Sequence, residues 1–84
     1  MSLLVLSVAF TSCAQPQLRG GVTAAQFEQI KPVIRAETVA RITALTLQPD
    51  GFMCVETAGA FTYYLRRVNG RWEIDRERIK VVGD

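Results

Sequence analysis

The Asn-Gly dipeptide at residues 69–70 is the feature that most constrains how this chain can fold. Between two β-prone runs, Asn-Gly predicts a two-residue type I′ hairpin, because both residues readily adopt the positive φ that this turn requires. Such a turn sets Val68 opposite Arg71 and thereby defines the register of the hairpin. Five apolar residues then share one face: Phe61, Tyr63, Leu65, Trp72 and Ile74. This face is suited to a hydrophobic core.

The other face of the hairpin carries polar and charged side chains. The same register places Arg66 opposite Glu73 and Tyr64 opposite Asp75, which is typical of a solvated, ion-paired sheet surface. Tyr64 and Arg66 are therefore the candidate surface contact for a protein or a glycan. A slip by one residue would scatter both the apolar and the charged set, so the sequence specifies its own register.

A helix is predicted to begin directly after Thr23. This residue is a good N-cap, and Gln26 three residues later completes a capping box. Val22 and Phe27 occupy the two positions of a hydrophobic staple, and apolar residues continue at helical spacing. Pro32 lacks an N–H and disfavours helical geometry at the residue before it. The helix therefore either ends just before Pro32 or continues beyond it, with a kink, for about four residues.

Between this helix and the hairpin, the sequence predicts two further strands. Residues 39–47 are rich in β-branched and aliphatic side chains, and Pro-Asp-Gly at 49–51 indicates a turn into a return strand at 52–57. The last strand of the hairpin is expected at 71–76, and the tail at 77–82 either extends it or forms a short edge strand. The predicted fold class is α+β, with one N-terminal helix packed on an antiparallel β-meander of three to four strands.

The composition of the chain argues against several kinds of active site. The chain has no histidine and only two cysteines, Cys13 and Cys54, so histidine-based triads and the usual zinc-ligand sets are excluded. Its acids are interleaved with arginines, and its net charge is only +2. We therefore predict no catalytic residue, no metal, no cofactor, no small-molecule ligand and no nucleic-acid partner.

The first part of the chain is typical of an export signal. An uncharged apolar run from Leu3 to Phe10 leads into two small residues and Cys13. The run is too short to span a bilayer and has the length of a signal-peptide core. The pattern resembles a bacterial lipobox, although Phe10 stands where leucine is usual and no basic residue precedes the run. The resemblance implies that Cys13 carries lipid and is the first residue of the mature protein.

Two other interpretations of this segment stay open. One is a cut after Ala14 that yields a secreted or periplasmic protein without lipid, and the other is a structural segment of a cytosolic domain. With lipid on Cys13, Cys54 is expected to be a buried strand residue. Without lipid, a disulfide between the two cysteines is the alternative, because an oxidising compartment permits it.

Two stretches of the chain resemble known families. The hairpin from Phe61 to Asp75 resembles the terminal hairpin of small bacterial α+β domains, including NTF2-like ones, in which a tryptophan packs under the sheet. Residues 29–39, with the tyrosines Tyr63 and Tyr64, are similar to the small lipoprotein of the outer-membrane β-barrel assembly machinery, although the Gly-Met-Thr step after the proline is missing. Both resemblances imply binding or scaffolding.

The predicted organisation is a signal segment at 1–14, a tether at 15–21 that ends in two glycines, and one domain at 22–84. We expect a small binding or accessory domain without enzymatic activity, located in the cell envelope. Its expected partners are the membrane, through lipid on Cys13, and a protein of the envelope. The alternatives are a free secreted inhibitor or enzyme-accessory module, and a scaffold subunit of an envelope assembly complex.

Overall fold

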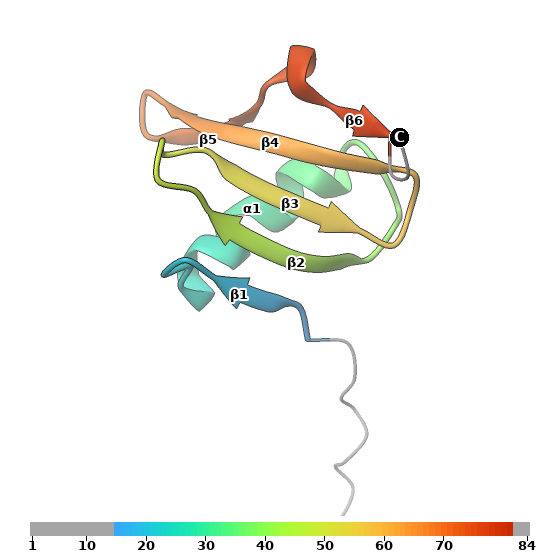
Figure 1. Ribbon diagram of the computed structural model, residues 1–84, viewed down its shortest axis with the longest axis horizontal. Coiled ribbons are helices and arrows are strands. Elements are labelled where there is room, and N and C mark those ends of the chain that lie inside the picture. The colour runs from blue at the N-terminus through green and yellow to red at the C-terminus, as the bar shows by residue number, and fades with distance from the viewer. Residues whose placement is uncertain (1–14, 82–84) are drawn as a thin grey trace, which may run out of the picture.

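The computed structural model describes residues 15–81 of the chain (Figure 1). They form an α+β domain, as predicted, in which helix α1, Ala24–Arg35, packs on one face of a mostly antiparallel sheet. The sheet contains six strands: β1 Gln17–Arg19, β2 Ile42–Leu47, β3 Met53–Thr57, β4 Phe61–Val68, β5 Arg71–Ile74 and β6 Lys80–Val81. The predicted signal segment at 1–14, with Cys13, lies outside the described residues, so its interpretation stays a prediction.

The order of the strands in the sheet is β1-β2-β3-β4-β5. Strands β2 to β5 are the predicted antiparallel meander, and two short strands are added at its edges. β1 pairs in parallel with β2, while β6 pairs with the beginning of β4 through Phe61 and Val81. β5 and β6 thus lie along the same edge of β4, separated by the short 3₁₀ helix η2, Arg76–Arg78.

The segment at 15–21, predicted as a tether, contains the short strand β1. Leu18 pairs with Leu45, so the segment adds a strand to the free edge of β2. The two glycines after it have φ of 70° at Gly20 and 89° at Gly21, and they turn the chain from β1 into α1. A three-residue strand is too short to show a periodic pattern, and it forms because an edge strand offers unpaired N–H and C=O groups.

The start of helix α1 is confirmed in detail, and Pro32 does not end it. The Thr23 hydroxyl accepts a hydrogen bond from the Gln26 backbone at 3.1 Å, and the Gln26 side chain accepts one from the Thr23 backbone at 3.0 Å. The helix continues through Pro32 to Arg35. Ile30 and Ile34, on either side of the proline, are fully buried against the sheet. Their burial offsets the hydrogen bond that the proline lacks.

The hairpin has the predicted turn and register. Asn69 has φ of 53° and Gly70 of 79°, and Val68 pairs with Arg71. The residues buried on the inner face of the sheet and on α1 form one core: Val22, Ile30, Ile34, Leu45, Met53, Val55, Tyr63, Leu65 and Trp72. Phe61 was expected in this core but is 42% exposed. It lies at the end of β4 that pairs with β6, where its ring contacts only one other aromatic ring among the described residues, that of Tyr63.

Two strand boundaries differ from the prediction because side chains cap the backbone there. β5 ends at Ile74, since the Asp75 carboxylate accepts a hydrogen bond from the Glu77 N–H at 3.1 Å and begins η2. β2 begins at Ile42 instead of residue 39, because the Thr38 hydroxyl accepts a hydrogen bond from the Ala40 N–H at 3.0 Å and turns the chain.

Candidate binding surface

A single helix is too narrow to cover the inner face of this sheet. A helix with its side chains is about 10 Å wide, whereas five strands spaced about 4.8 Å apart span roughly twice that width. The strand that α1 follows at short Cα–Cα distance over several residues is β5, at one edge of the sheet. The inner face beside β1 and the beginning of β2, at the other edge, is therefore left partly uncovered.

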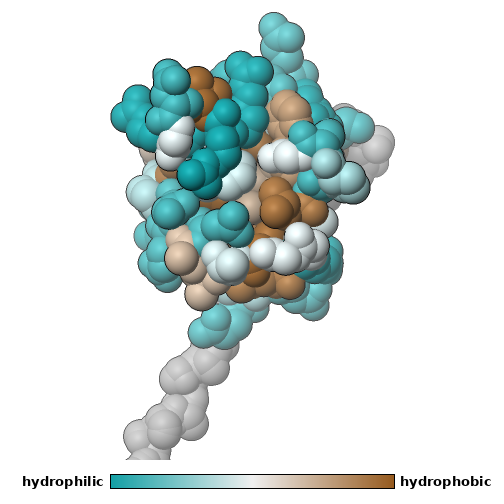
Figure 2. Space-filling model, turned by 90° about the vertical axis from the view of Figure 1, so that its left-hand side faces the viewer, coloured by the Kyte–Doolittle hydropathy of each residue, from teal (hydrophilic) through white to brown (hydrophobic). Residues whose placement is uncertain are grey.

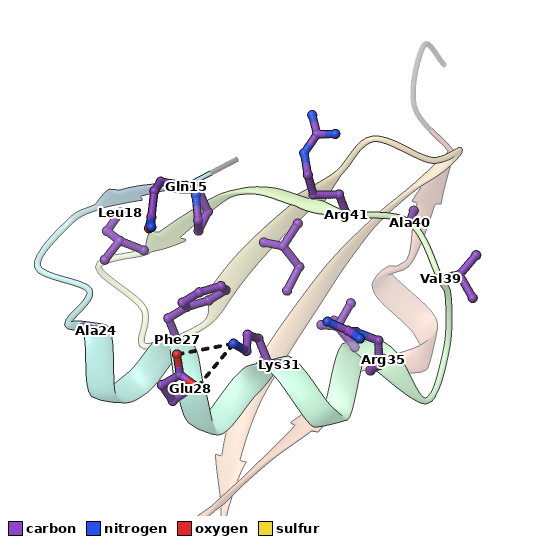
Figure 3. A pocket seen from close by; sticks show the side chains of 13 residues that line it. Gln15, Leu18, Ala24, Phe27, Glu28, Lys31, Arg35, Val39, Ala40 and Arg41 are labelled. Atoms are coloured by element: carbon purple, nitrogen blue, oxygen red, sulfur yellow. Dashed lines mark hydrogen bonds and ion pairs between the residues drawn. The ribbon is translucent and has the colours of Figure 1, made fainter. Parts of the chain in front are cut away.

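A groove with a volume of about 560 Å³ lies in this uncovered region (Figure 3). Apolar side chains from three segments line it, among them Leu18 of β1, Phe27 of α1 and Ile42 of β2. Lys31 and Arg35 project from α1 along the groove. The groove therefore combines an apolar floor with a cationic rim.

The charges on this rim are only partly compensated. Lys31 Nζ lies 3.3 Å from the Glu28 carboxylate and 5.2 Å from the centre of the Phe27 ring. Arg35 and Arg41 are exposed, and neither forms an ion pair within residues 15–81. Because Glu28 neutralises Lys31, the uncompensated charges are those of the two arginines, which lie at the end of the groove beside the loop from α1 to β2. The Arg41 side chain points away from α1 there (Figure 3).

Apolar side chains are also exposed at the groove. Val39, between the two arginines in the sequence, is 98% exposed, and Leu18 is 39% exposed. The two side chains lie at opposite ends of the groove (Figure 3). The chemistry of this groove suits a partner that is both anionic and amphipathic.

A second hollow, of about 570 Å³, lies on the opposite side of α1, beside β5. Val33, Trp72 and the β4–β5 turn line it, together with one cation, Arg71, and one anion, Glu73. Figure 2, which views the end of the molecule where this turn lies, shows apolar and polar side chains mixed over the surface. This hollow has no net charge and no fully exposed apolar side chain, so its chemistry points to no class of partner.

The candidate contact residues Tyr64 and Arg66 share the outer face of β4, as predicted. Arg66 is exposed and pairs in register with Glu73. Tyr64 is half-buried, because Arg78 of η2 lies over it with its guanidinium carbon 4.3 Å from the ring centre. The same guanidinium lies 4.6 Å from the Phe52 ring. Arg78 was missed from the sequence, since η2 replaces the strand that was expected there.

Cys54 is a buried residue of β3, and it lies opposite Tyr64 on the neighbouring strand. Burial raises the pKa of the Cys54 thiol, and the nearby Cys54 raises the pKa of the Tyr64 phenol. Both groups are therefore protonated near neutral pH. A protonated thiol is a poor nucleophile.

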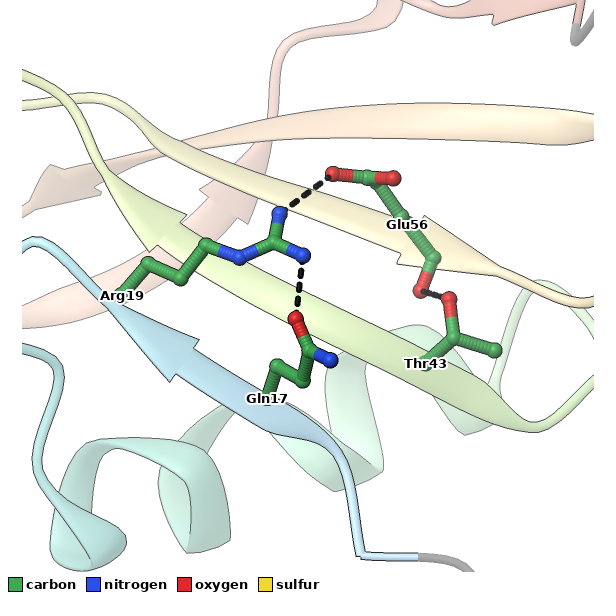
Figure 4. Close-up of polar contacts among 4 residues, drawn as sticks. All are labelled: Gln17, Arg19, Thr43 and Glu56. Atoms are coloured by element: carbon green, nitrogen blue, oxygen red, sulfur yellow. Dashed lines mark hydrogen bonds and ion pairs between the residues drawn. The ribbon is translucent and has the colours of Figure 1, made fainter.

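Several acids of the domain are held in ion pairs with basic side chains. Arg19 of β1 reaches Glu56 of β3 at 3.5 Å and also donates to Gln17 (Figure 4). Arg76 donates two hydrogen bonds to Glu37, of 2.6 and 2.7 Å. Over residues 15–81 no three metal-ligating side chains come together. These pairs hold the carboxylates of Glu56 and Glu37 beside basic side chains on the surface of the domain.

Comparison of the chain with protein-family models, with curated proteins and with solved structures finds no match. The resemblances of the terminal hairpin and of residues 29–39 therefore stay predictions. In the part of the chain that the structure describes, no helix is long and apolar enough to cross a membrane.

The groove itself was missed from the sequence. Its residues come from β1, α1 and the loop into β2, and β1 was not predicted. The one signal that points to it is the short stretch Arg35–Arg41, in which Val39 stands between two arginines. Val39 was instead interpreted as the first residue of a strand.

Proposed function

We propose that the protein is a non-enzymatic binding domain of the bacterial cell envelope, and that its binding surface is the groove between α1 and β1. The observation that supports this proposal most directly is the pairing of an apolar floor with two uncompensated cations, Arg35 and Arg41. A binding role also agrees with the chemistry of the other polar groups. The chain has no histidine, and the Cys54 thiol is protonated near neutral pH.

The anchor in this proposal is lipid on Cys13. The signal-like segment supports it, and so does the position of the groove in the chain. Cys13 precedes Gln15 by two residues, and Gln15 already lines the groove. An anchored domain would therefore present the groove close to the membrane, where its partner is to be sought.

Photo-crosslinking in the membranes of a bacterial host tests both parts of this proposal. Val39 is replaced by the photoreactive residue p-benzoylphenylalanine, because its side chain is 98% exposed at the groove. After irradiation, the intact mass of the purified protein is measured. We expect an adduct on the protein and a mature chain that begins with acylated Cys13.

The matched control carries the same photoreactive residue at Arg71, which is exposed at the first position of β5. We expect no adduct there. Equal adducts at the two positions, or none at Val39, would show that the groove is not the binding surface. A mature chain that begins at Gln15 would mean that the protein is secreted without a lipid anchor. A chain that still carries Met1 would rule out export.

A further inference from the structure

The groove lies within reach of the proposed lipid anchor. An extended chain advances at most about 3.6 Å per residue, so Gln15 lies within about 7 Å of Cys13. The polar headgroup layer of one leaflet is itself about 5–7 Å thick. If Cys13 is acylated, as the proposed function holds, the edge of the groove lies at the level of the lipid headgroups.

The edge of the sheet that carries this groove is also the edge nearest the anchor. β1 is the first strand of the sheet, and β5 and β6 lie at the opposite edge (Figure 1). Gln15 and Leu18 belong to the β1 side of the groove. The domain therefore turns its β1 edge, with the groove, towards the bilayer.

The side chains at the groove match the chemistry of an anionic lipid surface. Arg35 and Arg41 each present a planar guanidinium, which binds phosphate oxygens in a bidentate manner. Val39 stands between them in the sequence, and its side chain points outward from the loop between α1 and β2 (Figure 3). It is almost fully exposed, as is typical of an apolar side chain that enters the membrane interface. Glu28 is the only acid in the described lining of the groove, and Lys31 neutralises it.

We propose that the partner of the groove is the anionic phospholipid surface in which the protein is anchored. Arg35 and Arg41 bind headgroup phosphates, and Val39 enters the interface beside them. This inference rests on the proposed function, because it requires lipid on Cys13. The lipid anchor keeps the groove at a high effective concentration of headgroups, so weak contacts suffice to hold the domain in one orientation.

The outer face of the sheet is then free for other contacts. The groove and α1 lie on the inner face, whereas Tyr64, Arg66 and the ion pair between Arg19 and Glu56 lie on the outer face. A domain held by its groove has a defined orientation, with Arg66 accessible away from α1.

A fluorescent label at the groove tests this inference on the full lipidated protein. The variant Val39→Cys is labelled with a polarity-sensitive dye and reconstituted in vesicles of phosphatidylcholine alone or with added phosphatidylglycerol. Lipid blocks Cys13, and Cys54 reacts slowly because it is buried and its pKa is raised.

We expect a blue shift of the dye emission and quenching by spin-labelled lipid only in the vesicles with phosphatidylglycerol. About 1 M salt, which shortens the screening length to about 3 Å, should reverse both. A label at Arg71→Cys should report water in both vesicles.

Two double variants, each with the label at position 39, lose the same number of positive charges at different places. They show whether docking depends on the arginines of the groove or only on the net charge of the protein. Each cation near an anionic membrane strengthens binding about fivefold, so Arg35→Gln with Arg41→Gln should lower the ratio of docked to undocked protein about 25-fold. Arg66→Gln with Arg71→Gln should leave it unchanged. Equal losses in the two variants would overturn the inference, because attraction would then depend on net charge alone.

The outcome also distinguishes this inference from the proposed function. A label at position 39 that reports water in both vesicles, on protein with acylated Cys13, overturns the lipid docking. If Val39 then crosslinks to a protein in membranes, the groove is a protein-binding site and the proposed function stands. If intact masses show no acylated Cys13, both the anchor and the lipid docking are wrong.

Discussion

The two sides of helix α1 differ in how well the sheet is covered. Towards β5, Leu65 is fully buried and Trp72 is 7% exposed, and the ion pair between Glu37 and Arg76 joins the end of α1 to the beginning of η2. Towards β1, Leu18 is 39% exposed and the groove is open. The same helix therefore closes the core on one side and leaves apolar surface accessible on the other.

This difference suggests separate roles for the two sides of α1: the covered side stabilises the fold, and the open side is available for binding. The core of a domain of this size is only just large enough to keep the chain folded. Apolar surface that stays exposed adds nothing to the stability of the domain. The β5 side contains the buried Tyr63, Leu65 and Trp72, which are part of the core. The β1 side contributes less, and a partner that covers it recovers the burial that the helix does not provide.

The largest expected effect is that of Trp72→Ala on the covered side. We expect the free energy of unfolding to fall by about 3–5 kcal/mol, as for other buried aromatic residues. The loss is one of packing, because the buried Trp72 Nε1 has no hydrogen-bond partner among residues 15–81. Urea denaturation followed by circular dichroism measures it.

The matched variant on the open side is Leu18→Ala, with an expected cost of about 1 kcal/mol, because much of this side chain is already in water. If Trp72→Ala does not fold, the milder Trp72→Phe is compared with Leu18→Ala instead. Equal costs on the two sides would remove the distinction between a covered and an open half.

The next largest effect is expected at the turn between β1 and α1. A Cβ at Gly20 would lie 2.3 Å from the Leu47 carbonyl oxygen, whereas a Cβ at Gly21 would meet no atom within 4 Å. Both glycines have positive φ, so each alanine substitution costs about 1 kcal/mol from backbone strain. Gly20→Ala must also displace β1 from β2, and we expect a total of about 2–3 kcal/mol.

Denaturation and amide hydrogen exchange measure this pair of glycine variants. In Gly20→Ala, the amides of β1 and of the facing residues of β2 should lose protection, while those of β4 and β5 keep it. In Gly21→Ala, protection in β1 should be retained. The same loss in both variants would mean that β1 is held by something other than its close approach to Leu47.

The smallest effect is expected from the ion pair at the end of α1. Hydrogen bonds from Arg76 lower the pKa of Glu37 below its ordinary value of 4.5. The stabilisation is therefore fully present above that value and is lost as the pH falls through the lowered pKa. Arg76→Gln should reduce stability slightly near neutral pH, and the difference should vanish at acidic pH.

Urea midpoints of the parent protein and Arg76→Gln between pH 3 and pH 7 measure this small difference. The effect is small because the Arg76 side chain is largely exposed and the pair is screened by water. A difference that stays constant over this range would show that Arg76 acts through packing and not through the charge of Glu37.

The features predicted correctly depend on interactions between residues that are near in sequence or paired through one turn. Thr23 caps the helix through a residue three positions away, and the turn at 69–70 defines its own strand register. The errors arise where distant parts of the chain meet. Phe61 is exposed because β6 and not α1 lies beside it, and Arg78 covers Tyr64 because η2 returns over the outer face.

The sequence by itself determined the type of fold, the start of the helix, the hairpin register and the absence of histidine chemistry. These follow from backbone preferences, capping hydrogen bonds and alternating polarity, all of which act over a few residues. The tertiary structure alone decided that the helix continues through Pro32, that β1 adds to β2, and which part of the sheet stays uncovered. The reason is geometric: the groove exists because one helix is narrower than five strands, and no local pattern encodes that difference.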